Sequence, residues 1–107
     1  MNIFKKIKAY LRYHEAVKQA EKAHESTGHR YYVMPMSGTK GKLIIMDRDN
    51  FRKLKVKGYI SQNARVKHLE LECFYCTSYR KGNGRLSPED IKSKKELFYQ
   101  WFEHTNK

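Results

Sequence analysis

Three segments of this chain carry apolar residues on one side only, and this pattern constrains the fold more than any other feature. The segments span residues 3–26, 66–79 and 87–102. Each needs another element to cover its apolar face, so the three are expected to pack around one core. A chain of 107 residues has room for one such core, and no Pro- or Gly-rich linker divides it. The sequence therefore predicts a single domain over residues 1–107.

Residues 3–26 have the three- and four-residue apolar spacing of a helix. The expected inner face is formed by Ile3, Phe4, Ile7, Tyr10, Leu11, His14 and Val17. Gly28 follows at the position of a left-handed C-terminal cap. Because lysines flank its apolar residues, the start of this helix is also a candidate membrane-surface element. We expect the domain to use the apolar face for its own core instead.

The next segments predict a hairpin and a short helix. Strands are expected over residues 31–34 and 42–46, joined by a turn from Ser37 to Gly41. So short a connection requires antiparallel pairing. The segment 37–42 does not fit the Walker phosphate-binding pattern, because neighbouring residues lack the required Gly and Ser or Thr. Asp47 is a suitable N-cap for a helix that runs through Lys57 and stops at Gly58.

Residues 66–79 alternate between apolar and polar side chains, which predicts the longest strand of the chain. Leu69, Leu71 and Cys73 are expected on one face of it. A loop follows over residues 80–85, and the last helix begins with Ser87 as N-cap and Pro88 at the first helical position. The apolar face of this helix comprises Ile91, Phe98, Trp101 and Phe102.

The predicted fold is therefore a small α+β domain with the element order α-β-β-α-β-α. Its three-stranded sheet has helices packed against it.

The net charge of the chain limits the kinds of partner that it can bind. The chain carries 23 Lys and Arg residues against 11 Asp and Glu residues, a formal net charge of +12. Such an excess favours polyanions, acidic protein faces or an anionic membrane surface as partners. Residues 28–63 hold eight basic and two acidic residues, which is half of the net charge. No apolar run is long enough for a membrane span.

A nucleic-acid-binding surface is predicted from the central segment and the loop after residue 79. On a helix, Arg48, Arg52 and Lys55 would form a cationic ridge suited to a phosphate backbone. Tyr79 could stack on a base beside the basic loop. The expected contact residues are Lys40, Lys42, Arg48, Arg52, Lys53, Lys55, Lys57, Arg80, Lys81 and Arg85. The alternative is that these charges form an ordinary solvated face.

No catalytic, cofactor or metal motif stands out. Cys73 and Cys76 form a lone C-x-x-C pair, which we expect to be reduced and metal-free in a regular strand, with the two side chains on opposite faces. Two cysteines and no export signal favour a cytoplasmic location. The main hypothesis is a non-catalytic accessory protein that binds DNA or RNA through its phosphate backbone. The alternative is an adaptor that binds an acidic protein surface.

Overall fold

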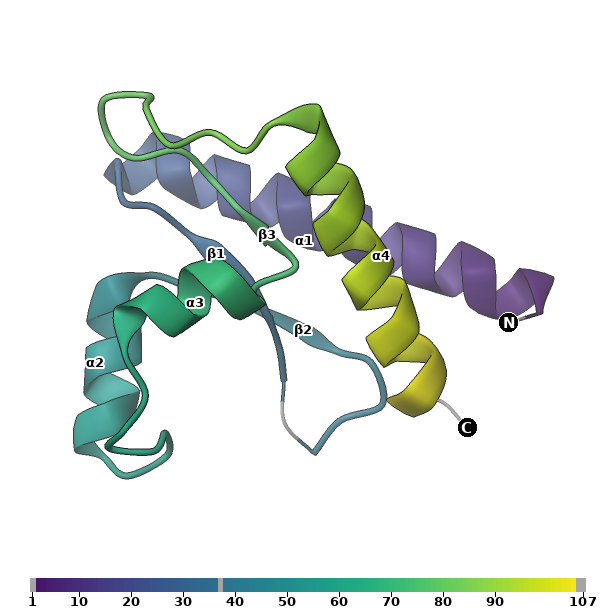
Figure 1. Cartoon of the computed structure of the whole chain (residues 1–107), viewed down its shortest axis with the longest axis horizontal. Helices are drawn as coiled ribbons and strands as arrows, with labels where there is room; N and C mark the ends of the chain where they lie inside the picture. The colour runs from purple at the N-terminus through teal and green to yellow at the C-terminus, as the bar shows by residue number, and fades with distance from the viewer. Residues whose placement is uncertain (1, 37, 106–107) are drawn as a thin grey trace.

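A computed structural model describes residues 2–36 and 38–105 of the chain. The elements are α1 (Ile3–Thr27), β1 (Tyr32–Pro35), β2 (Leu43–Met46), α2 (Arg48–Val56), α3 (Val66–Glu72), β3 (Tyr75–Cys76) and α4 (Pro88–Thr105) (Figure 1). The α+β class and the order α-β-β-α-β-α are confirmed, with α3 as an additional helix before the last strand.

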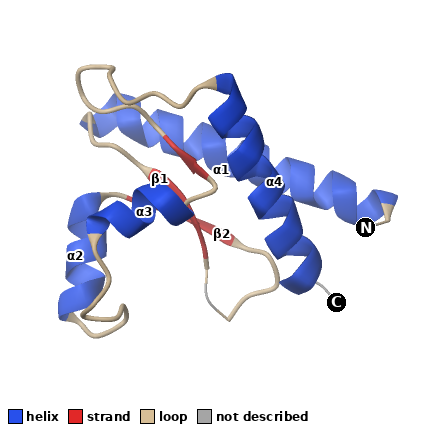
Figure 2. Cartoon of the chain, viewed as in Figure 1, coloured by secondary structure: helices blue, strands red, loops and turns tan. Residues whose placement is uncertain are grey.

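The sheet is antiparallel, and β1 is its central strand. The strand order is β2-β1-β3, with Val33 opposite both Ile45 and Tyr75. Figure 2 shows the three short strands enclosed by helices. The predicted hairpin is confirmed, and the Met36 amide closes its turn on the Lys42 carbonyl at 3.0 Å. Ser37, part of the predicted turn, lies outside the described residues.

The core has two parts, one on each face of the sheet. Successive strand residues point to opposite faces, so Val33 joins one part and Tyr32 the other. The first part contains Tyr13 of α1 and Phe98 of α4, and Trp101 packs against it. The second part lies against the short helices and contains the buried residues Tyr32, Met46, Phe51, Leu69, Cys73 and Cys76.

Helix α1 buries a different face from the one that its strongest apolar residues predict. Its buried residues are Ala9, Tyr13, Ala16 and Ala20. The expected inner residues Ile3, Phe4, Ile7, Tyr10 and Leu11 are all more than half exposed, and His14 is exposed too. Val17 does pack against the core as expected, but the prediction was wrong for the other residues because small alanine side chains allow a close approach to the sheet and α4. The Tyr13 hydroxyl also donates to the Phe74 carbonyl at 2.9 Å.

The predicted strand over residues 66–79 is also wrong in its extent. Residues Val66–Glu72 form α3, and only Tyr75–Cys76 pair as a strand. The apolar pattern fits a strand and a helix equally well, because Leu69 and Cys73 are an even number of residues apart and also one helical turn apart. In the structure both are buried. Leu71, expected on the same face, is 71 % exposed. The Arg65 amide donates to His68 Nδ1 at 2.9 Å and fixes the start of the helix.

The predicted helix caps are confirmed. Asp47 Oδ1 accepts from the Asn50 amide at 2.8 Å, and Ser87 Oγ accepts from the Asp90 amide at 3.1 Å. Gly28 ends α1 with φ +79°. These signals act within a few residues and so can be recognised in sequence alone. Within residues 2–36 and 38–105, no helix combines the length and apolar content needed to cross a bilayer.

Lys94 of α4 closes the C-terminal end of α3. Its Nζ donates to the carbonyls of Glu70 at 2.8 Å and Cys73 at 3.2 Å. We expect Lys94→Met to lower the free energy of unfolding by about 1.5–3 kcal/mol, because partly buried carbonyls lose a charged donor. Denaturation in urea measures this, with the exposed Lys92→Met as control. Equal stability of the two variants would contradict the capping role.

Candidate nucleic-acid interface

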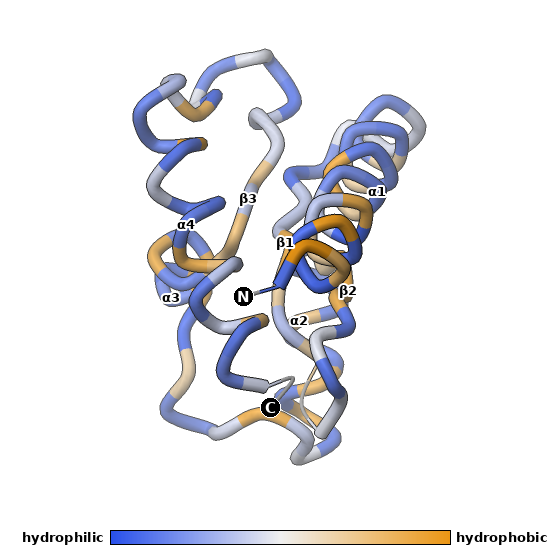
Figure 3. The backbone as a smooth tube through the Cα atoms, turned by 90° about the vertical axis from the view of Figure 1, so that its right-hand side faces the viewer, coloured by the Kyte–Doolittle hydropathy of each residue, from blue (hydrophilic) through white to orange (hydrophobic). Residues whose placement is uncertain are grey.

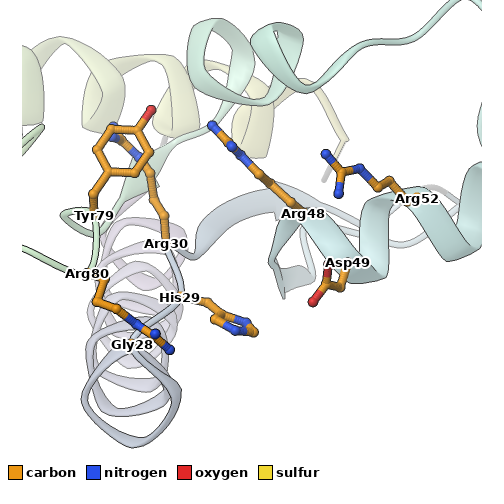
Figure 4. Close-up of a pocket in the computed structure, with 8 residues that line it drawn as sticks. All are labelled: Gly28, His29, Arg30, Arg48, Asp49, Arg52, Tyr79 and Arg80. Carbon is orange, nitrogen blue, oxygen red and sulfur yellow. The ribbon is translucent and has the colours of Figure 1, made fainter.

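Four arginines line one concave surface at one end of the sheet (Figure 4). The cavity has a volume of about 270 Å³ and is called the arginine pocket below. Its lining residues are Gly28, His29, Arg30, Arg48, Asp49, Arg52, Tyr79 and Arg80. These residues come from the segment before β1, the first half of α2 and the loop after β3.

The strand register explains why residues so distant in sequence meet here. Tyr32, the first residue of β1, lies opposite Met46 at the end of β2 and Cys76 at the end of β3. The residues that precede β1 and follow β2 and β3 therefore emerge at the same edge. Arg48 and Arg52 lie four residues apart on α2, which places both guanidinium groups on the same side of the helix.

Tyr79 and Arg30 contact each other in the arginine pocket, and both are held by further interactions. The Arg30 guanidinium carbon lies 4.2 Å from the centroid of the Tyr79 ring, and that of Arg48 lies 5.8 Å from it. The Tyr79 hydroxyl donates to Glu70 Oε1 at 2.5 Å. This hydrogen bond raises the pKa of Tyr79, so the phenol stays neutral and keeps its donor role. The ring is thereby held in place as a support for Arg30.

Arg30 is also held by a contact with Cys76. Its Nη2 donates to Cys76 Sγ at 2.9 Å. Its buried Nε has no hydrogen-bond partner among the described residues. An unsatisfied buried donor costs free energy, which an acceptor on a bound ligand could recover. The side chain is therefore partly preorganised for an anion.

Two glycines make room for two of the arginines. A Cβ atom on Gly28 would lie 2.7 Å from Arg80 Nε, and one on Gly84 would lie 2.6 Å from Arg30 Nη1 and from the Tyr79 ring. Both glycines have positive φ, a conformation that other residues adopt at a cost of about 1–2 kcal/mol. The guanidinium groups therefore occupy space that only glycine leaves open.

Replacement of Gly84 by Ala is expected to displace Arg30 and Tyr79 and to weaken anion binding. Gly82→Ala is a matched control, because Gly82 has φ +83° in the same loop and open space at its Cβ position. Both variants should lose similar stability from backbone strain, and only Gly84→Ala should bind more weakly. Titration with a labelled oligonucleotide measures the difference. Equal affinities would show that the position of Arg30 does not matter.

The charge of the arginine pocket is only partly neutralised within the protein, by the nearby Asp49 carboxylate and by the Cys76 thiol, whose thiolate Arg30 stabilises. None of the four arginines forms an ion pair with a carboxylate in the described part of the chain. Asp49 lies at the pocket without such a pair, and Asp47 pairs with His29 at 3.0 Å. Clustered guanidinium groups repel one another, so a multivalent anion that accepts several of their N–H groups is strongly favoured there.

One group of side chains could offer ligand atoms to a metal ion. Single atoms of His29, Asp47 and Asp49 lie within 4.8 Å of one another. However, Asp47 already uses Oδ2 for His29 and Oδ1 for the N-cap of α2. The four nearby arginines also oppose a divalent cation. We therefore interpret this group as a structural hydrogen bond between His29 and Asp47 beside the Asp49 carboxylate.

The two cysteines are buried free thiols at the base of the site. They do not lie in a regular strand on opposite faces, as the sequence predicted, because α3 ends at Cys73 and the chain bends before β3. Both side chains belong to the same part of the core and interact with each other. A hydrogen bond from Cys73 and the Arg30 guanidinium lower the pKa of Cys76 well below its usual range.

Cys76 is expected to titrate below the usual range of a cysteine thiol in the native protein, because Cys73 and Arg30 favour its thiolate. Its pKa in the unfolded chain is about 8.5, so its contribution to stability is full above that pH and is lost as the pH falls through the lower native pKa. Thiolate ultraviolet absorbance measures the midpoint. Cys76→Ser should abolish the transition, and Arg30→Met should raise its midpoint. A wild-type midpoint near 8.5 would contradict the thiolate–guanidinium contact.

The arginine pocket contains three of the contact residues predicted from sequence, namely Arg48, Arg52 and Arg80. Lys55, the third residue of the expected ridge, instead donates from Nζ to the Ala64 carbonyl at 2.8 Å. The other predicted residues are exposed outside it: Lys40 and Lys42 in the hairpin turn, Lys53 and Lys57 around α2, and Lys81 and Arg85 in the loop after Arg80.

The sequence-based list of contact residues omitted Arg30 and His29. Both follow the Gly28 cap and precede a strand, so no helical or loop pattern marks them. The sequence predicts a stacking role for Tyr79 but not its contact with Arg30. The place of Arg30 and His29 follows only from the strand order, because residues just before the central strand lie where the flanking strands end.

Comparison of the chain with protein-family models, with curated proteins and with solved structures finds no match.

Proposed function

We propose that this protein is a non-catalytic DNA- or RNA-binding protein that holds backbone phosphates in the arginine pocket. The observation that carries the proposal is the cluster of four arginines without carboxylate partners around one concave surface. A net charge of +12 would raise the local concentration of any nucleic acid around it. A cytoplasmic location fits the two free thiols.

The chemistry of guanidinium groups suits phosphate oxygens. Each group can donate two parallel hydrogen bonds to a phosphate, and binding releases counterions from the nucleic acid. The exposed Lys53 and Lys57 extend the positive surface along α2, and Lys81 extends it along the loop. These contacts do not read bases, so little sequence preference is expected.

Binding to labelled duplex DNA, single-stranded DNA and RNA tests the proposal. In fluorescence anisotropy, the logarithm of the affinity should fall linearly with the logarithm of the salt concentration, with a slope of about −0.9 for each neutralised phosphate on duplex DNA. Polyglutamate is the competing probe for an acidic protein partner. Displacement of nucleic acid only at a large excess of polyglutamate supports the proposal. Tighter binding to polyglutamate than to any nucleic acid would favour the adaptor function instead.

A further inference from the structure

The N-terminal half of α1 exposes a continuous apolar surface. Ile3 is 67 % exposed, Phe4 80 %, Ile7 51 %, Tyr10 51 % and Leu11 60 %. They recur every three or four residues and so lie on one side of the helix, which we call the α1 stripe. The backbone of these turns is coloured partly as apolar in Figure 3, and the N-terminal turns of α1 extend beyond α4 in Figure 1. Such a cluster on a small protein marks an interaction surface.

The core does not bury the α1 stripe, although Tyr10 at its end lies near Lys95 of α4. At about 100° per residue, the centre of the stripe lies roughly 150° around the helix from the buried face formed by Ala9, Tyr13, Ala16 and Ala20. The sequence alone suggested that the core needs the stripe, but alanines and Tyr13 provide the packing instead. Burial of the stripe is therefore left to a partner.

The apolar surface continues from α1 towards α4. A shallow cavity of about 460 Å³ between the two helices is lined by Lys6, Tyr10, Tyr99 and Glu103. Tyr10 and Tyr99 have amphipathic rings of the kind enriched where hydrocarbon meets water. The α1 stripe thus adjoins a cavity that has two aromatic residues, Tyr10 and Tyr99, and two charged ones, Lys6 and Glu103.

Basic residues flank the α1 stripe on both sides. By helical position, Lys6 lies along one border and Lys8 along the other. Residues 2–14 contain Lys5, Lys6, Lys8 and Arg12 and no acidic residue. A second copy of the chain would bring two such positive borders together, which is unfavourable. An anionic lipid surface provides both hydrocarbon for the stripe and negative charge for its borders.

We propose that the α1 stripe binds the surface of an anionic phospholipid bilayer. The helix lies in the plane of the interface, with Phe4, Ile7 and Leu11 in the acyl region. The aliphatic stems of Lys6 and Lys8 lie along the apolar surface and extend their ammonium groups to the phosphates. This proposal is independent of the arginine pocket and stands if nucleic-acid binding is disproved.

Sedimentation with vesicles tests the proposal on the full chain. The protein is first treated with nuclease and washed at high salt to remove bound nucleic acid. One set of vesicles is phosphatidylcholine alone, and the other contains phosphatidylglycerol as well. We expect roughly tenfold or greater preference for the anionic vesicles, since each Lys or Arg near such a surface contributes about 1 kcal/mol.

A pair of matched variants separates the α1 stripe from net charge. Phe4→Glu with Ile7→Glu should lower vesicle binding roughly tenfold or more, because two apolar side chains can no longer insert. Val56→Glu with Leu71→Glu changes charge equally at residues that are 85 % and 71 % exposed elsewhere. This control should bind within about threefold of wild type, because it keeps the apolar surface intact. Circular dichroism should show both variants folded.

Three results would overturn the proposal. The first is no sedimentation of the wild type with anionic vesicles. The second is equal loss in the two double variants, which would make binding a matter of net charge. The third is a wild-type dimer in light scattering that the stripe variant dissociates, with no vesicle binding; the occupant would then be a second copy of the chain.

Discussion

Replacing Arg48, Arg52 and Arg80 together by alanine is expected to weaken the binding of both DNA and RNA by roughly 100-fold. Each exposed guanidinium–phosphate pair is assigned about 1 kcal/mol, the upper end for exposed ion pairs, and three together correspond to about two powers of ten. The slope of log affinity against log salt should fall by about 0.9 for each lost phosphate contact. All three side chains are exposed, so the fold should be preserved. Anisotropy titrations at several salt concentrations measure both quantities.

The matched control for this triple variant replaces Lys53, Lys57 and Lys81 by alanine. It removes the same charge from exposed residues outside the arginine pocket. We expect a smaller loss of affinity, because these lysines do not converge on one cavity. If the two triple variants lose affinity equally, only the overall charge matters and the pocket is not a specific site. If the arginine variant no longer binds polyglutamate but still binds nucleic acid, the adaptor function is the better explanation.

Phe98→Ala should lower the free energy of unfolding by about 3–5 kcal/mol, the usual cost of removing a buried phenyl ring. Phe98 is fully buried, and its ring centroid lies 5.4 Å from those of both Tyr13 and Phe74. Its loss would leave a cavity between α1, α4 and the sheet. Urea denaturation followed through Trp101 fluorescence measures the effect, since Trp101 packs against this part of the core.

The neighbouring residue provides the control for Phe98. Leu97 is 48 % exposed on the same helix, and Leu97→Ala should cost well under half as much. Comparable losses in the two variants would mean that α4 does not pack as described.

The parts of the fold that could be predicted from sequence depend on local chemistry. Gly28, Asp47 and Ser87 mark helix ends through contacts within a few residues, and the short turn forces the hairpin to be antiparallel. The strand prediction for residues 66–72 was wrong because the alternation of their apolar side chains is also compatible with helical spacing. A single sequence offers no means of choosing between the two periods.

The face of α1 was mispredicted for a different reason. Both sides of this helix are apolar, and hydrophobicity alone favours the side with Ile3, Phe4 and Leu11. Close packing against a sheet favours small residues instead, but the sheet and α4 are not visible from the helix sequence. The arginine pocket also depends on tertiary structure, because the pairing of Tyr32 with both Met46 and Cys76 brings its arginines together.

The length of α1 separates the α1 stripe from the arginine pocket. The α1 stripe is centred on Ile7, and Gly28 at the other end lines the arginine pocket. At about 1.5 Å per residue, the two lie roughly 30 Å apart along the helix. Electrostatic screening in physiological salt acts over about 8 Å, so an anion at one end hardly alters the potential at the other. The helix would thus act as a rigid spacer, able to hold two mutually repelling polyanions on one small protein.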